Sequence, residues 1–167
     1  MNVTLVLGFH NMNAAYISNR HWDMLLPVKT DCVAESLGFR VLPVNMDRHG
    51  DVKLMLSIEK GVKTIGYNPK DTTREIRKAI AIGIAKYVNG RVGPNDFLKY
   101  KDISLNKTES LEHNADLKMA WELIMPRDAV RTMVLRVGQT DVRNLAYDFD
   151  VSVSDITKRL REVGLLY

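Results

Sequence analysis

The fold is decided by the stretch Arg74-Glu75-Ile76-Arg77-Lys78-Ala79-Ile80-Ala81-Ile82-Gly83-Ile84-Ala85-Lys86-Tyr87-Val88. From Ile76 to Tyr87 its apolar residues recur three and four positions apart, which is the spacing of one face of an α-helix. Just before it, Thr72 stands three residues ahead of Glu75, a capping-box pattern whose hydroxyl and carboxylate bind the first backbone N–H groups. We therefore predict a helix from Thr72 whose apolar face packs on the core.

Strand and turn patterns lie upstream of this helix. A short helix is predicted from about Asp31, with Gly38 as its stop, followed by a strand over residues 40–44. Pro43 in that strand indicates an edge position, because proline cannot donate to a neighbouring strand. Residues 52–58 and 62–67 alternate around a short turn and predict a hairpin. We expect a small antiparallel sheet in the N-terminal half.

The rest of the chain is mostly helical in pattern. Residues 89–108 are irregular and polar, and four helical segments follow. The predicted helices cover about residues 110–124, 127–137, 141–149 and 154–163, with Gly164 as the last cap. The fold class expected is α+β and mostly helical. The closing pair over 141–167 is expected to pack on the rest, which makes residues 1–167 one domain.

The composition describes a single folded domain. The chain has 167 residues, 46% of them hydrophobic and 26% charged, which suffices to bury a core. No run of roughly 18 apolar residues is present, so no membrane span is expected. Residues 2–9 alternate like a strand and lack the basic start of a signal peptide. The single Cys32 excludes an internal disulfide, and the cytoplasm is the expected location.

The net charge of +4 is concentrated in one segment. Between Lys70 and Arg91 stand six basic residues against two acidic ones. Such a segment can attract phosphates or an acidic partner, but it is more typical of a solvated helix face.

The stretch 74–88 resembles the active-site helix of the ImmA/IrrE family of zinc metallopeptidases, which usually reads R-x-x-I-A-H-E-x-G-H-Y-x-L. Ile80-Ala81 and Tyr87-Val88 fit that frame. The two zinc-binding histidines are replaced by Ile82 and Lys86, and the general-base glutamate by Gly83. Isoleucine and lysine do not bind zinc here, and glycine cannot accept a proton. The resemblance thus implies a zincin-like fold without catalytic residues, metal or cofactor.

The resemblance extends from about residue 31 to residue 166. Its most specific part is Glu112-His113-Asn114-Ala115-Asp116-Leu117-Lys118-Met119-Ala120-Trp121-Glu122-Leu123-Ile124-Met125-Pro126, which is similar to E-x-x-A-[DN]-x-F-A-x-x-L-L-M-P. In the family, the position of Glu112 supplies the last zinc ligand. Ile82 and Lys86 are expected to face Glu112 and Asp116 across a cleft. Lys86 either restores the charge balance of Glu112 in place of the metal or points to solvent.

The closing helices also permit a DNA-binding interpretation. Ala146, Asp150 and Ile156 stand at the fifth, ninth and fifteenth positions of a helix-turn-helix. Such a motif places the second helix in the major groove, where Lys158, Arg159 and Arg161 are the candidate contacts. Residues 127–167 carry seven basic and six acidic residues, however, and Asp148, Asp150 and Asp155 disfavour phosphates.

Two functions follow from these observations. The first is a pseudoenzyme related to a phage or mobile element, which regulates by binding a repressor or another protein. The second is a small DNA-binding regulator that uses the helix-turn-helix-like segment. The partner and the oligomeric state stay open.

Overall fold

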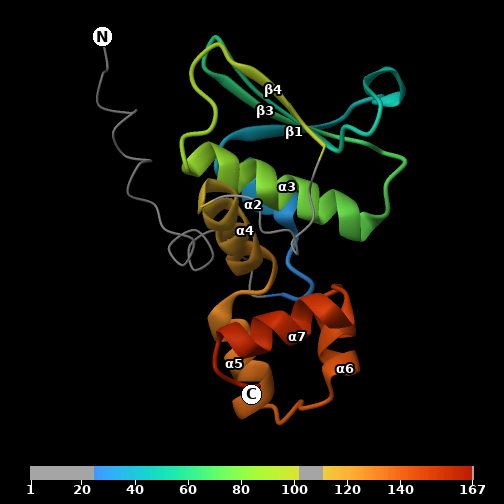
Figure 1. The fold of residues 1–167 in the computed structure, drawn as a ribbon, viewed down its shortest axis with the longest axis vertical. Helices are drawn as coiled ribbons and strands as arrows, with labels where there is room; N and C mark the ends of the chain where they lie inside the picture. Colours follow the sequence, from blue (N-terminus) through green and yellow to red (C-terminus); the bar gives the residue numbers. More distant parts are fainter. Residues whose placement is uncertain (1–24, 102–110, 167) are drawn as a thin grey trace.

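A computed structural model describes residues 25–101 and 111–166, with the side chains of residues 111–114 left aside. The strand pattern at residues 2–9 lies outside these residues. The described part is an α+β fold with six α-helices and a four-stranded mixed sheet. Figure 1 shows the sheet on one side of the long helix α3, with α4 on its other side and α5–α7 farthest from the sheet.

The sheet has the strand order β1-β3-β2-β4. Its strands are β1 (Phe39–Pro43), β2 (Leu54–Glu59), β3 (Val62–Tyr67) and β4 (Phe97–Tyr100). The predicted hairpin is confirmed, because β2 and β3 pair antiparallel through Lys60 and Gly61, both at positive φ. Among the described strands β1 lies at the edge of the sheet and pairs with β3 alone, which agrees with the edge position predicted from Pro43.

The prediction of a purely antiparallel sheet is wrong. β1 runs parallel to β3, with Phe39 opposite Lys63 and Pro43 opposite Tyr67. The hairpin places β3 between β1 and β2, so β1 meets the strand that runs in its own direction. The segment predicted to be irregular also contains β4, which pairs antiparallel with β2.

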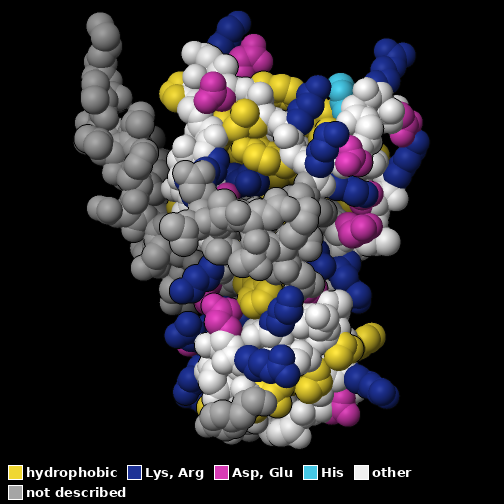
Figure 2. All heavy atoms as spheres, viewed as in Figure 1, with side chains coloured by type: hydrophobic (Ala, Val, Ile, Leu, Met, Phe, Trp, Pro, Cys, Tyr) yellow, Lys and Arg dark blue, Asp and Glu magenta, His cyan; other side chains and the backbone are white. Residues whose placement is uncertain are grey.

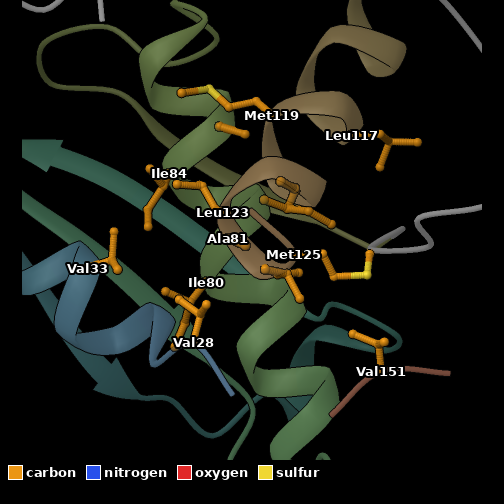
Figure 3. Packing of buried hydrophobic residues seen from close by; sticks show 14 of the residues in the cluster. Val28, Val33, Ile80, Ala81, Ile84, Leu117, Met119, Leu123, Met125 and Val151 are labelled. Carbon is orange, nitrogen blue, oxygen red and sulfur yellow. The ribbon is translucent and has the colours of Figure 1, made fainter. Parts of the chain in front are cut away.

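Helix α3 (Thr73–Val88) is the centre of the core. Thr72 caps it as predicted: its Oγ1 accepts from the Glu75 backbone N–H at 3.3 Å, and the Glu75 carboxylate accepts from the Thr72 N–H at 3.0 Å. Every residue from Ala79 to Lys86 is buried, so α3 packs on all sides rather than on one face. Figure 3 shows Ile80, Ala81 and Ile84 among side chains from other elements.

Gly83 sets the distance between α3 and the sheet. A Cβ atom at this position would lie 3.2 Å from both Leu54 Cδ1 and Ile65 Cδ1. The absence of a side chain therefore lets the helix approach β2 and β3 closely, at a cost of about 1 kcal/mol in helix propensity relative to alanine.

The other helices are α2 (Thr30–Ser36), α4 (Leu111–Ile124), α5 (Arg127–Leu135), α6 (Val142–Asp148) and α7 (Val153–Glu162). They agree with the predicted segments to within a few residues at each end. Asp150, between α6 and α7, has a φ of 47°, a left-handed conformation that aspartate tolerates better than most residues. None of the described helices combines the length and hydrophobicity that crossing a membrane requires.

Candidate functional site

The six basic residues between Lys70 and Arg91 all form ion pairs. Their partners are Asp47 for Lys70, Asp150 for Arg74 and Arg77, Asp155 for Lys78, and Asp116 for Lys86 and Arg91, at N–O distances of 2.7–3.4 Å. Apart from Lys70 and Arg74, these basic side chains are only 9–25% exposed. The segment is therefore neither an open phosphate-attracting patch nor a simple solvated face, because its basic groups form ion pairs with acidic residues of the same chain.

The most buried of these pairs lies where α3 meets α4. The Lys86 ammonium is 3.2 Å from Asp116 Oδ2, and the two side chains are only 10% and 2% exposed. Asn89 Nδ2 donates to the other carboxylate oxygen at 2.7 Å, and Arg91 Nε lies 3.4 Å from it. We call Lys86, Asn89, Arg91, Asp116 and Tyr100 the Lys86 cluster.

Tyr100 closes this cluster from the edge strand β4. The Lys86 ammonium lies 4.2 Å from the centre of its ring, within the range of a cation–π interaction. Burial raises the pKa of the Tyr100 hydroxyl, and the charge of Asp116 raises it further. The phenol is thus neutral at physiological pH, and the cluster joins two cations, one carboxylate, one amide and one neutral ring. The charge of Asp116 is stabilised by Lys86, Arg91 and the Asn89 amide together.

The resemblance aligns four positions (82, 83, 86 and 112) with the zinc-binding and general-base residues of the peptidases. These positions lie in different surroundings. Ile82 is 1% exposed within the main core, and Gly83 faces Leu54 and Ile65 of the sheet. The position of Glu112 lies in α4, but its side chain lies outside the described residues. The described carboxylate at Lys86 is Asp116, one helical turn farther along α4 than the Glu112 predicted to pair with it.

A second polar junction joins α3 to the turn between α6 and α7. Arg77 donates from Nε to the Val28 carbonyl at 2.9 Å and from Nη1 to the Asp150 carbonyl at 2.9 Å. The same guanidinium reaches the Phe149 carbonyl and the Asp150 carboxylate. Burial lowers the pKa of Arg77, and Asp150 opposes that shift. This network fixes the left-handed turn against α3.

Of the three predicted DNA contacts, Arg159 does not face solvent. Its side chain is 1% exposed, and its guanidinium binds Glu122, Glu162 and the Met125 carbonyl. The prediction that Arg159 contacts DNA is therefore wrong, because its buried side chain links α7 to the end of α4. Lys158 is half-buried and Arg161 is exposed.

The sequence patterns predict only one of these partners, Asp116 opposite Lys86. They do not indicate the roles of Asn89 and Tyr100, nor the pairing of Asp150 and Asp155 with α3. One signal was available: Arg77, Lys78 and Lys86 lie on several sides of an otherwise apolar helix, so a helix buried all round needs acidic partners for them.

Among residues 25–101 and 111–166, no group of three or more His, Cys, Asp or Glu side chains is placed to hold a metal ion. No family model matches the chain, and none of the curated proteins matches it either. The likeness to ImmA/IrrE peptidases therefore stays a resemblance carried by the motifs quoted above.

Proposed function

We propose that the chain is a catalytically inactive, peptidase-like regulatory protein that acts by binding a protein partner. In the resembled family, active members cleave transcriptional repressors, typically those of mobile elements and stress responses. A phage- or mobile-element-related protein that binds such a repressor without cleaving it is the function that the resemblance favours.

One observation carries this proposal: the buried ion pair of Lys86 and Asp116. The resemblance places a zinc-binding histidine at position 86, facing carboxylates on the next motif. An ammonium 3.2 Å from Asp116 supplies positive charge to that carboxylate in place of a divalent cation. A single buried carboxylate without a cation is costly, so the Lys86 cluster keeps the fold intact where the chemistry of a peptidase is lost.

Restoring a metal site tests the alignment of positions 82 and 86 with the two zinc-binding histidines. We expect the double variant Ile82→His, Lys86→His to bind about one Zn²⁺ per chain, because two imidazoles four residues apart on a helix join Asp116 as ligands. The measurement is competition with a chromophoric zinc chelator, together with elemental analysis. The unaltered chain should bind no stoichiometric zinc under the same conditions.

A second histidine pair gives the baseline. Arg131→His, Leu135→His places two imidazoles four residues apart on the exposed side of α5. The α3 variant should bind zinc at least about tenfold more tightly than this control, since a third ligand adds to the pair. Equal affinities in two folded variants would show that positions 82 and 86 do not face a metal-binding carboxylate, and the proposal would lose its basis.

DNA binding is the second candidate, and one observation favours it. Asp150 and Asp155 are paired with basic residues of α3, so two of the three carboxylates expected to repel phosphates are neutralised. If this candidate holds, duplex DNA should bind with an affinity that falls steeply with salt, and Arg161→Ala should lower the salt slope by about 1. A gel-retardation titration at several salt concentrations measures both; binding without that salt dependence argues against this candidate.

A further inference from the structure

The outward side of α5 carries exposed arginines, whereas the basic residues around α3 are held in ion pairs. Its exposed residues are Arg127, Asp128, Arg131, Thr132 and Leu135, and exposed Arg136 and Val137 follow the helix. We call this set the α5 face. The arginines form no ion pair with any residue in the described part of the chain, whereas all six basic residues around α3 are paired. Figure 2 shows Lys and Arg side chains over the helical end of the molecule, with fewer Asp and Glu among them.

The spacing on α5 is that of a binding stripe. Arg127, Arg131 and Leu135 follow one another at four-residue intervals and therefore lie along one side of the helix. Leu135 is 60% exposed and Val137 is 64% exposed. Arg127 and Arg131 thus precede two exposed apolar side chains along the chain, which form the apolar end of the face. Asp128 is the one acidic residue on the face.

The apolar end separates a protein partner from a nucleic acid. Phosphates are bound by Lys, Arg and polar groups, and a leucine and a valine exposed by more than half their surface add nothing to such contacts. Arginine beside exposed apolar side chains is instead typical of protein interfaces. Charge complementarity then requires carboxylates opposite Arg127 and Arg131.

We propose that the α5 face is the docking surface for an acidic amphipathic helix of a partner protein. Two carboxylates four residues apart on that helix pair with Arg127 and Arg131, and its apolar residues cover Leu135 and Val137. This inference rests on the proposed protein-binding function and names the surface and the chemistry of the partner.

The test uses the full chain and two fluorescein-labelled synthetic peptides. The first is a helical peptide of two heptads with glutamates four residues apart beside a leucine stripe, and the second has lysine at each glutamate. We expect saturable binding of the acidic peptide by fluorescence anisotropy and none of the basic one. Arg127→Glu, Arg131→Glu should weaken binding at least tenfold and Leu135→Ser at least fivefold. The doubly reversed variant should gain affinity for the basic peptide.

Arg143→Glu is the matched control, because Arg143 is an exposed arginine of α6 that forms no ion pair with a described residue. It should change the affinity less than twofold. Absence of binding, or equal weakening by Arg143→Glu, overturns the inference. Displacement of the peptide by duplex DNA with no effect of Leu135→Ser would assign the face to nucleic acid and overturns it too. The zinc experiment measures metal binding at positions 82 and 86 and uses α5 only as a site for its control pair, so the two proposals fail separately.

Discussion

Arg159→Ala should lower the free energy of unfolding by about 3 kcal/mol, because removing one member of a buried charge network leaves the others uncompensated. The guanidinium is the shared donor for Glu122, Glu162 and the Met125 carbonyl. Without it, the Glu122 carboxylate loses its cation and keeps the hydrogen bond from the Arg127 backbone N–H, and the Met125 carbonyl at the end of α4 loses the guanidinium as a donor. Urea unfolding followed by circular dichroism measures the change.

Arg161 provides the control for this prediction. It stands two residues away on the same helix, is exposed, and is of the same chemical type. Arg161→Ala should change the stability by no more than about 0.5 kcal/mol. If the two alanine variants unfold at the same urea concentration, the junction between α7 and α4 does not stabilise the fold.

Lys86→Met should also cost about 3 kcal/mol. Methionine retains the length and apolar stem of lysine but removes the ammonium from Asp116, which is 2% exposed. The remaining donors, Asn89 and Arg91, offset only part of the cost of a buried carboxylate. The midpoint of urea denaturation, compared at constant m-value, reports the loss.

Two further variants separate the ion pair from its surroundings. Adding Asp116→Asn to Lys86→Met removes the buried charge and should recover more than half of the lost stability, which a double-mutant cycle measures as coupling. Lys70→Met breaks a pair whose side chains are 68% and 52% exposed and should cost no more than about 1 kcal/mol. Additive effects at positions 86 and 116 would contradict the pairing.

The sequence predicted the parts of the fold that depend on neighbouring residues. The capping box at Thr72 and Glu75, the spacing of α3 and the turn at Lys60-Gly61 are local signals, and the structure contains each of them. The parallel pairing of β1 with β3 arises because β3 lies between β1 and β2 in the sheet. Strand order is not predicted by any local sequence pattern. Strand β4 has four residues and is only half-buried, so its alternation is too short to stand out.

In the candidate site, too, local residues could be predicted from the sequence and their distant partners could not. Lys86 was visible as a basic residue in an apolar helix, but its partner lies 30 residues away on α4. Glu112 and Asp116 lie on one side of that helix, and the sequence does not decide which of them meets Lys86. Arg159 looked like a surface residue because its acceptor Glu122 is 37 residues distant. Burial of a charge is set by such distant partners, and a helical pattern alone does not reveal them.

The ion pairs around α3 also constrain how this sequence can change over time. A substitution at Lys78 or Lys86 removes the ammonium from Asp155 or Asp116, which are 1% and 2% exposed, and the reverse change removes the carboxylate that the lysine binds. Neutral drift at either end is therefore blocked unless the other end changes too. Among natural relatives, positions 78 and 155, and positions 86 and 116, should covary, while exposed Lys70 and Asp47 are free to vary independently.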